Sequence, residues 1–434
     1  MNITFPADHQ TPLSRKHWLM LLFIFGIAFA LRLLATIMFE GLAEGPSQRG
    51  FGADAVEFNA IAANLAGHGE YTIEPHHPTS FRAPGFPFAL AGIYALFGVN
   101  NFSAAHLFFC LIGAALTLVV FFLAREVTHL NTALIAAGLV AVYPNVLYYA
   151  IHFSSEPLFT LLLTLSLWLF LRGAKYHAPH FYAYSGLLLG LAALTRPLAF
   201  YFFPFYVVAA LWLGRSRCKS TLSGLFLFML LVALPIAPWT ARNYLVHHRY
   251  LLIASNGGST FWGSNNSVVL NDPHCRGGWV STNYMPDEKA EVRKLTNEVD
   301  RDRLEWKFGE TFLTQHSKDI PRLVWYKFRA LWTPFCDTPN KKFNLIIGLS
   351  YGFMIPMMGW GFWLFLRSRR ADSPEMIILL LPIIVTVLSC LAIYGSARFR
   401  STIEPILMVF AAEAFMRVAN TLSGLLPPVG SIKK

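Results

Sequence analysis

The sequence is poor in charge for its length. Charged residues make up only 14% of its 434 residues, whereas 55% are hydrophobic. Its mean hydropathy is +0.47. A soluble domain does not need so many unbroken apolar runs, so the composition excludes a soluble globular protein. It indicates instead an all-α membrane protein that crosses the bilayer many times.

Several ligand-binding motifs are also absent. The sequence has neither a P-loop nor a dinucleotide-binding glycine motif, so nothing in it points to a bound nucleotide. The polar stretch 40–101 contains no Asp-X-Asp pair, and the adjacent His76 and His77 have no spaced acid or cysteine beside them. We therefore predict no metal ligands and no required cofactor, and a divalent metal is not indicated.

Cysteine is scarce, and positive charge is not. Two of the five cysteines, Cys275 and Cys336, share one large polar region, and the spacing leaves open whether they form a disulfide. The net charge of +11 could suggest nucleic acid, but the cations lie at the ends of apolar runs. Membrane orientation and anionic lipid partners explain that distribution better, so we predict no nucleic-acid partner.

The apolar runs predict about ten transmembrane helices. The stretch 86–97 is too short to be an eleventh, because about twelve helical residues reach only roughly 18 Å. We therefore expect it to lie at the interface. The predicted spans are 18–39, 102–124, 132–151, 155–171, 181–195, 197–214, 221–239, 343–366, 376–394 and 401–418.

Lysine and arginine between the spans fit this count with both termini in the cytoplasm. The arrangement leaves two sizeable regions outside, the first loop 40–101 and the polar region 240–342. We therefore divide the chain into a membrane module with the first loop (1–239), an external region with helices (240–342), and C-terminal membrane helices with a tail (343–434). The external region is predicted to contain a solvated helix from Asp287 to Gln315.

The first loop contains the most informative stretch. Asp54 stands where the N-cap of a short amphipathic helix belongs, and Gly69 follows the end of the apolar pattern. We expect this helix to lie flat on the membrane. Arg82 is followed by Pro84 and Pro87, which stiffen the return of the chain into the membrane. An acid and a cation are thus predicted near one membrane face.

A set of arginines lies on the side of the membrane where the orientation rule predicts few. Arginine binds phosphate in a bidentate manner, so the set suits a phosphate or pyrophosphate held at headgroup level. Contact with ordinary lipid headgroups is the alternative explanation for each one singly. The set consists of Arg82, Arg196, Arg242, Arg398 and Arg400.

Carboxylates near these arginines are candidates for acid–base chemistry. Asp54 begins the first-loop helix, and Glu156 lies at the predicted outer end of a span. A carboxylate near lipid can act as a general base on an acceptor hydroxyl or amine. A plain helix cap would also explain Asp54, and a helix-start charge before Pro157 would explain Glu156. Glu57, one turn after Asp54, is a weaker candidate because a solvated helix face accounts for it.

Short stretches in this order resemble the GT-C superfamily of membrane glycosyltransferases, in particular its protein mannosyltransferase and aminoarabinose transferase branch. The resemblance covers most of residues 18–418. Asn243 and Asn256 lie in two of the stretches and are further candidates for the site. The stretches are the helix at Asp54, Arg82–Pro87, Leu194–Pro197, Pro238–Tyr244 with Ser255–Gly258, and Ala397–Arg400 with Glu404.

The resemblance implies transfer of a sugar from a polyprenyl-phosphate donor, with inversion, on the outer face of the membrane. It implies that Asp54 is the base and that Glu156 is a second catalytic acid. Arg82, Arg398 and Arg400 would hold the donor phosphate. A bacterial inner membrane is favoured, and the acceptor could be a lipid, a glycan or a protein. Some relatives have a second acid after the loop aspartate, where this chain has Ala55, and this departure puts the donor and acceptor in doubt.

Two other functions fit the same sequence. A multi-pass transporter or lipid flippase would explain the spans and the basic outer residues. Transporters more often place charged or helix-breaking sites near the middle of the membrane in both halves of the chain. An assembly or scaffold subunit would make Asp54 dispensable. Because the charges collect at one face, we favour the glycosyltransferase.

Overall fold

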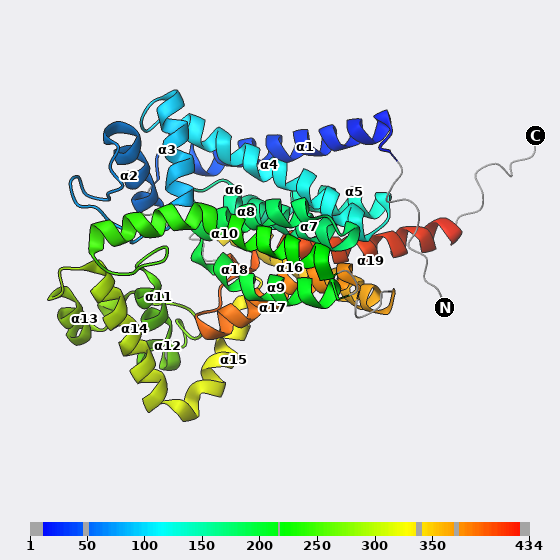
Figure 1. The fold of residues 1–434 in the computed structure, drawn as a ribbon. Helices are drawn as coiled ribbons and strands as arrows, with labels where there is room; N and C mark the ends of the chain where they lie inside the picture. The colour runs from blue at the N-terminus through cyan, green and yellow to red at the C-terminus, as the bar shows by residue number, and fades with distance from the viewer. Residues whose placement is uncertain (1–11, 47–51, 216–217, 336–340, 369–372, 426–434) are drawn as a thin grey trace, which may run out of the picture.

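The computed structural model describes residues 12–46, 52–215, 218–335, 341–368 and 373–425. Within these ranges the regular secondary structure is helical, apart from an isolated bridge between Thr72 and Pro78. Long apolar helices form a bundle (Figure 1). The first turns of α1 and the last turns of α19 lie at one end of this bundle. The two polar regions lie at the other end, which we call the loop end.

The bundle helices account for most of the predicted apolar stretches. A π-helical turn at Thr36–Glu40 extends α1, and a 3₁₀ turn at Pro197–Tyr201 precedes α9. The helices are α1 (Arg15–Ala35), α4 (Phe102–Val127), α5 (Leu130–Val142), α6 (Pro144–Ala150), α7 (Glu156–Tyr176), α8 (Pro179–Thr195), α9 (Phe202–Leu213), α10 (Cys218–His247), α16 (Lys341–Ser368), α17 (Pro374–Ala392) and α19 (Glu404–Leu425).

The count of ten spans is not confirmed. Seven helices in the described ranges are long and apolar enough to cross a membrane, or eight if the bent pair α5 and α6 is one span. This pair bends by 56°, because Pro144 cannot continue α5. α9 has only 12 residues, and α8 has 17. Helices do lie at all ten predicted positions, and the stretch at 86–97 is a short helix of 13 residues.

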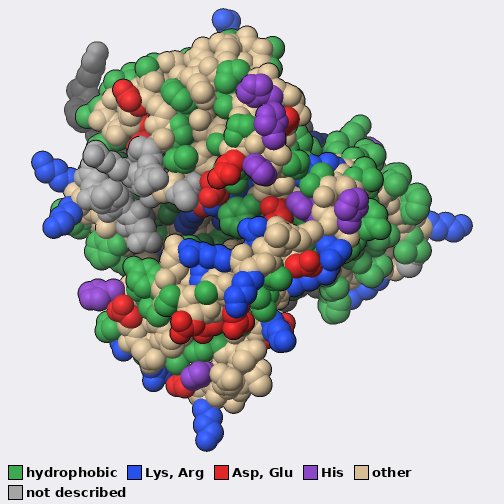
Figure 2. Space-filling view, turned by 90° about the vertical axis from the view of Figure 1, so that its left-hand side faces the viewer, with side chains coloured by type: hydrophobic (Ala, Val, Ile, Leu, Met, Phe, Trp, Pro, Cys, Tyr) green, Lys and Arg blue, Asp and Glu red, His purple; other side chains and the backbone are tan. Residues whose placement is uncertain are grey.

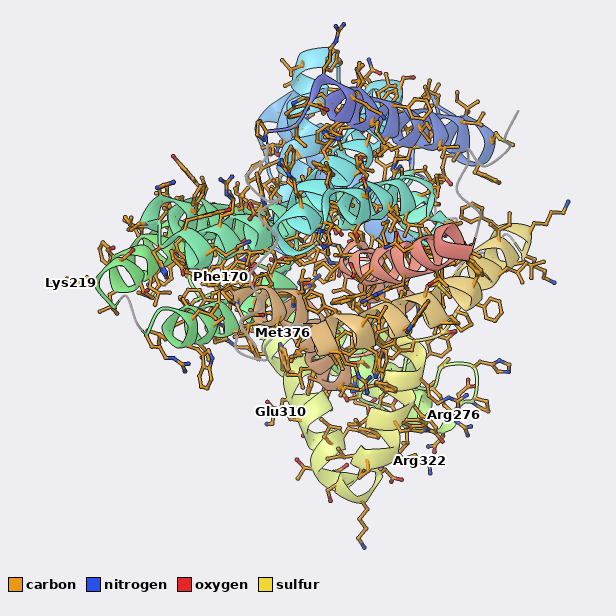
Figure 3. All side chains as sticks on the ribbon, turned by 90° about the vertical axis from the view of Figure 1, so that its right-hand side faces the viewer. Phe170, Lys219, Arg276, Glu310, Arg322 and Met376 are labelled. Carbon is orange, nitrogen blue, oxygen red and sulfur yellow. The ribbon has the colours of Figure 1, made fainter. Side chains whose placement is uncertain are left out.

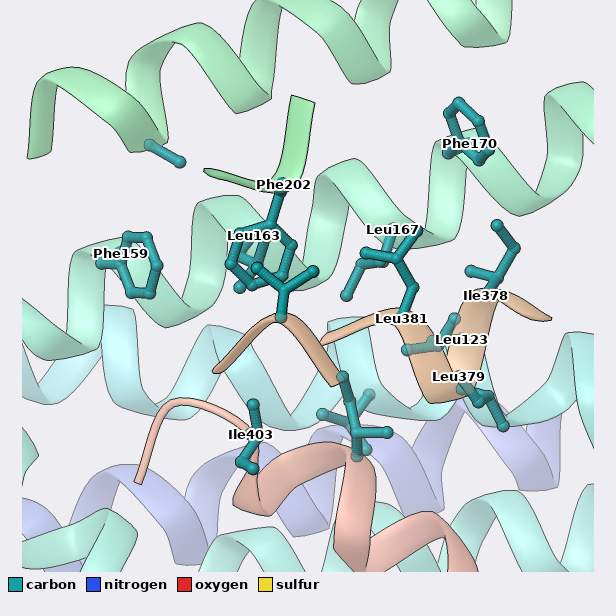
Figure 4. Packing of buried hydrophobic residues seen from close by; sticks show 14 of the residues in the cluster. Leu123, Phe159, Leu163, Leu167, Phe170, Phe202, Ile378, Leu379, Leu381 and Ile403 are labelled. Atoms are coloured by element: carbon teal, nitrogen blue, oxygen red, sulfur yellow. The ribbon is translucent and has the colours of Figure 1, made fainter. Parts of the chain in front are cut away.

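The bundle core is built where α4, α7, α9 and α17 meet. Leu123, Leu163, Phe202 and Leu381 interdigitate there (Figure 4). Close backbone approach tightens the neighbouring α8–α10 pair. A side chain at Gly186 would place its Cβ only 2.3 Å from the carbonyl oxygen of Phe228. Small residues of this kind let membrane helices pack closely, which gives the site a rigid base.

Shorter helices form the loop end. Glu298 joins its two regions, because its carboxylate accepts hydrogen bonds from Thr79 in the first loop at 2.8 Å and from Ser255 at 3.0 Å. The two regions therefore meet over the bundle. The helices there are α2 (Ala53–His68), α3 (Gly85–Phe97), α11 (Gly257–Ser264), α12 (Ser267–Asn271), α13 (Pro286–Arg293), α14 (Glu298–Gln315), α15 (Ile320–Leu331) and α18 (Ala397–Arg400).

Three local predictions need correction. The N-cap of α2 is Gly52, so Asp54 lies in the first turn with its carboxylate free for other partners. The boundary at 239/240 falls inside α10, which continues to His247 as one helix. The predicted solvated helix from Asp287 to Gln315 is two helices, since the side chain of Asn297 caps a new one, α14. Cys336 lies outside the described residues, so its pairing with Cys275 stays open.

Candidate active site

A cavity of about 200 Å³ lies where the first loop, the bundle and α11–α14 meet. The loop end of the molecule is hollowed, and acidic and basic side chains gather around the hollow (Figure 2). Charged and polar residues from all three parts of the chain line the cavity. They include Asp54, Arg82, Ser155, Arg196, Asn256 and Arg398.

The sequence around Arg82 brings the first loop onto the bundle. Gly85 begins α3 and lies against the end of α8, where a Cβ would be 2.7 Å from the backbone nitrogen of Thr195. Only glycine fits this approach without a shift of backbone. Since Arg196 directly follows Thr195, the contact places the loop arginine and the bundle arginine on one cavity.

Two arginines hold the carboxylate of Asp54. Arg82 Nη2 is 2.7 Å from Asp54 Oδ1, and Arg398 Nη1 is 2.8 Å from Oδ2. Burial raises the pKa of Asp54, but the charges of Arg398 and Arg82 outweigh it and lower that pKa to about 2. In this state the carboxylate is fully ionised and occupied by its partners.

Glu156 lies beneath this pair, at the first residue of α7, with its side chain 1% exposed. Its Oε1 accepts hydrogen bonds from Arg398 Nε and Arg196 Nη1. Arg196 also donates to the hydroxyl of Ser155 at 3.2 Å. A buried carboxylate needs such partners. Arg398 therefore joins the two predicted catalytic acids.

Arg82 faces the cavity with a third carboxylate behind it. Its Nε is 2.6 Å from Glu57 Oε2, so Glu57 orients Arg82 and does not line the cavity. The ring of Phe58 lies 5.6 Å from the guanidinium carbon and that of Phe81 lies 5.0 Å from it. Such aromatic neighbours fix the plane of a guanidinium.

One family model and several solved structures are similar to this chain. The family described as Dolichyl-phosphate-mannose-protein mannosyltransferase matches residues 76–241, a range that holds Arg82, Glu156 and Arg196. The archaeal oligosaccharyltransferase AglB from Archaeoglobus fulgidus, solved with an inhibitory peptide and a dolichol-phosphate, has a TM-score of 0.58 and 16% identity. That match covers 97% of this chain and 52% of the other. The chain therefore shares the fold of this oligosaccharyltransferase over almost its whole length.

Other solved structures give the same or weaker likeness. The apo form of the Archaeoglobus fulgidus oligosaccharyltransferase has a TM-score of 0.57 and 17% identity, over 96% of this chain and 52% of that one. The chain thus spans about half the length of these archaeal proteins. ArnT from Cupriavidus metallidurans, bound to undecaprenyl phosphate, has a TM-score of 0.44 and 11% identity, over 96% and 82% of the two chains. No curated protein matches the sequence.

Two predicted site residues, Arg242 and Asn243, do not line the cavity. Arg242 Nη1 donates to the carbonyl of Thr79 at 2.8 Å and to the hydroxyl of Ser80 at 2.7 Å. Asn243 accepts from the same Ser80 hydroxyl at 2.7 Å. In this structure Arg242 and Asn243 fasten the first loop to α10, and their role in phosphate binding stays a prediction.

Arg400, another predicted phosphate ligand, does not line the cavity either. It is fully buried, and its Nε donates to Glu404 Oε1 at 2.9 Å. Its guanidinium carbon lies 3.9 Å from the ring centre of Tyr351. In the short helix α18, Arg398 and Arg400 point to different partners, since residues two apart do not share a helix face. Arg400 holds α18 to the bundle while Arg398 faces the cavity.

Some residues that line the cavity had no signal in the sequence. They include three aromatic residues, Trp306 from α14, Tyr201 and Tyr394, to which the sequence analysis assigned no role. Asn256, a predicted candidate, does line the cavity next to α11. In the described ranges no three His, Cys, Asp or Glu side chains lie close enough to hold a metal ion. The cavity is thus built from guanidinium groups, carboxylates and aromatic rings.

Proposed function

We propose that this protein is a membrane glycosyltransferase that moves a sugar from a polyprenyl-phosphate donor to an acceptor. The single observation that carries the proposal is that Arg82, Arg196 and Arg398 converge with Asp54 on one cavity. Guanidinium groups bind phosphate oxygens in pairs, and a carboxylate beside them can accept a proton. The family matched over residues 76–241, described as a dolichyl-phosphate-mannose transferase, supports the same chemistry.

The site needs an exchange of partners before it can work. Three arginines face three carboxylates, Asp54, Glu57 and Glu156, so the charges are balanced without substrate. A phosphate entering the cavity would take guanidinium groups from Asp54. Burial raises the pKa of Asp54, whereas Arg398 and Arg82 lower it to about 2. Without these two partners the pKa of Asp54 would therefore rise. Donor binding would thus make Asp54 a stronger base.

The reaction balances with these groups. The acceptor hydroxyl or amine attacks the anomeric carbon, and the bond from that carbon to the phosphate oxygen breaks. The acceptor proton passes to Asp54, and polyprenyl phosphate leaves with the bonding electron pair. Negative charge develops on the phosphate as the bond breaks, so Arg82, Arg196 and Arg398 stabilise the transition state more than the ground state. Glu156 would hold Arg196 and Arg398 in place from below.

An apolar groove supports a lipid donor. A cavity of about 580 Å³ runs along α10 and is lined almost entirely by apolar side chains, among them Phe203, Val232 and Ile236. Phe200 of the same 3₁₀ turn faces this groove, while Tyr201 faces the active cavity. A prenyl chain in the groove would therefore lie next to its phosphate.

The location and the acceptor are parts of the proposal. We place the site at the outer face of a bacterial inner membrane, with both termini in the cytoplasm, because of the distribution of lysine and arginine. The acceptor would approach from a cavity of about 750 Å³ between the first loop and α14. Lipid, glycan and protein acceptors all remain candidates.

The test follows transfer and donor binding separately. Purified protein in nanodiscs is mixed with radiolabelled polyprenyl-phosphate sugars and a membrane extract as acceptor source. Wild type should release polyprenyl phosphate and label an acceptor. Asp54→Asn should bind donor but transfer at least about 10²-fold more slowly, the usual range for a lost general base. Arg82→Ala should instead weaken donor binding.

The outcome that would contradict the proposal is equally specific. If Asp54→Asn transfers sugar at the wild-type rate, Asp54 is not the base. If no donor is consumed, and a strain carrying Asp54→Asn has normal surface glycans, transport becomes the better account. Arg303→Ala, at an exposed arginine of α14 that does not line the cavity, serves as the matched control and should leave transfer unchanged.

A further inference from the structure

α15 exposes a row of aromatic side chains at the loop end. Trp325 is 55% exposed and Phe328 is 38% exposed. Their rings are stacked 5.8 Å apart at 16°, and the half-buried Trp332, which packs against the bundle core, lies 6.4 Å from Phe328. Spacings of three and four residues put these rings on one face of the helix. An aromatic row of this kind is unusual on a surface that faces water.

The opposite face of α15 fixes this orientation. Leu323 and Leu331 are buried, and so is Lys327, whose Nζ donates to Asn265 Oδ1 at 2.7 Å and to the carbonyl of Ala392 at 3.2 Å. The helix also packs against α17 and α18. The exposed aromatic row is therefore held outward by the fold and is not a result of a loosely attached helix.

Two arginines border the aromatic row. Arg322 and Arg329 are both exposed. They are about two helical turns apart, so they lie on the same side of the helix. Arg322 stacks over Tyr326 with its guanidinium carbon 5.8 Å from the ring centre, and Arg276 lies over the same ring at 5.2 Å. Aromatic rings beside arginines are typical of a helix that lies at the boundary between headgroups and acyl chains.

The position of α15 places this face toward the bilayer. In Figure 1 the helix runs across the direction of the bundle helices, at the base of the loop end. Figure 3 shows the bundle from the end opposite the loop end, and Arg322 lies to one side of the bundle in this view. The α14–α15 pair thus lies to one side of the bundle in both views.

The row also continues into a lipid-facing span. Phe335 packs against α16, where a Cβ on Gly348 would be 2.5 Å from the Phe335 ring. On α16 itself, Leu345, Leu349 and Phe353 are exposed by 56%, 66% and 64%. A span with such side chains faces acyl chains. The aromatic face of α15 is therefore next to a surface already in contact with lipid.

We infer that α15 is an interfacial anchor, which rests on the headgroup region of the bilayer and binds phospholipid phosphates through Arg322 and Arg329. Trp325 and Phe328 would insert at the boundary of the acyl chains. The anchor would hold the external region at a fixed height above the membrane. This inference does not depend on the proposed transferase activity.

Photo-crosslinking in nanodiscs tests the inference. Benzoylphenylalanine is placed at position 325 or 328 and irradiated, and adducts are identified by intact mass. Lipid adducts are expected at both positions and at the positive control, position 349 on α16. Position 288 is the negative control, because Glu288 is exposed on α13, at the far outer side of the loop end (Figure 1).

The same experiment can overturn the inference. Adducts to a second copy of the chain at positions 325 and 328, or no lipid adduct there while position 349 reacts, would show that the aromatic row does not face lipid. Nanodiscs with mixed phosphatidylcholine and phosphatidylglycerol test the arginines. Anionic lipid should be enriched several-fold among the adducts at position 325, and Arg322→Gln with Arg329→Gln should abolish that enrichment. Equal enrichment in the double variant would refute the role of the arginines.

Discussion

Arg398 Nη1 lies 2.8 Å from Asp54 Oδ2, although the two residues are separated by most of the chain. The same guanidinium donates through Nε to Glu156. One planar side chain thus fixes both acids, and its pKa is raised well above its ordinary value: burial lowers it, but Glu156 and Asp54 raise it more. This bridge is the part of the site that substrate must rearrange.

The first prediction concerns this bridge. Arg398→Lys should reduce transfer by about 10²-fold or more and weaken donor binding, because an ammonium group cannot hold two carboxylates in a fixed plane. Initial rates and donor affinity in nanodiscs measure both effects. Arg303→Lys, at an exposed arginine of α14 outside the cavity, is the matched control. Wild-type kinetics in Arg398→Lys would show that a point charge at this position suffices.

The second prediction concerns pH and Asp54. Burial raises the pKa of Asp54, but the charges of Arg398 and Arg82 outweigh burial and lower this pKa to about 2 in the folded protein. An unfolded aspartate has a pKa of about 3.9. Since the folded-state pKa is depressed, the stabilisation is present above about pH 4 and is lost as pH falls toward 2. It is of the order of 2 kcal/mol.

Thermal unfolding in detergent between pH 5 and 3 measures this linkage. Wild type should lose stability over this range more steeply than Asp54→Asn, which has no proton to gain. Both proteins share all other carboxylates, so their difference isolates Asp54. Parallel curves for the two proteins would mean that the ion pairs with Arg82 and Arg398 do not persist in solution.

A third prediction concerns the buried pair of Arg400 and Glu404, in which both side chains are fully buried. Removing one partner leaves a buried charge, which should destabilise the protein by about 3–5 kcal/mol. Arg400→Met alone and Glu404→Leu alone should therefore lower the unfolding temperature strongly. The double variant should recover much of the loss, because neither charge then remains. Additive losses in this double-mutant cycle would show that the two side chains do not interact.

Composition and periodicity predicted the helical membrane fold because apolar length alone decides which segments can enter a bilayer. They could not count spans. A 12-residue α9 and a pair bent at Pro144 depend on how neighbours cover their ends, and hydropathy does not report neighbours. α10 shows the same limit: the polar residues Arg242 and Asn243 suggested a loop, whereas their partners in the first loop keep the helix intact to His247.

The candidate site was predictable where a residue type has few uses at an interface. Asp54, Arg82 and Arg398 attracted attention because charge near lipid needs a reason, and the structure brings all three together. Arg400 could not be separated from Arg398 by sequence, since both occupy the same four-residue turn. Tyr394 was missed because an aromatic residue in a cavity has the same sequence signal as one in the membrane belt, and Trp306 because it lies in a segment that reads as a solvated helix.

The fourth prediction concerns Asp302 on α14, whose Oδ1 accepts a hydrogen bond from the backbone nitrogen of Gly258. Burial raises its pKa to about 6; the Gly258 hydrogen bond opposes this, and the nearby Glu305 and Glu298 add to it. The folded protein therefore holds a proton that the unfolded chain loses near pH 4. The contribution of Asp302 to stability is therefore greatest below about pH 4 and declines as pH rises through 6.

Asp302→Asn keeps an oxygen that can accept from Gly258 but has no charge to bury. We expect this variant to unfold at a higher temperature than wild type at pH 7 and to lose the decline between pH 4 and 6. Asp300→Asn is the matched control on the same helix, because Asp300 lies near the surface and pairs with Arg249 at 3.2 Å. The control should follow the wild-type pH profile. If Asp302→Asn follows it as well, Asp302 is ionised in the folded protein at no cost, and its carboxylate accepts the hydrogen bond from Gly258 in the charged form.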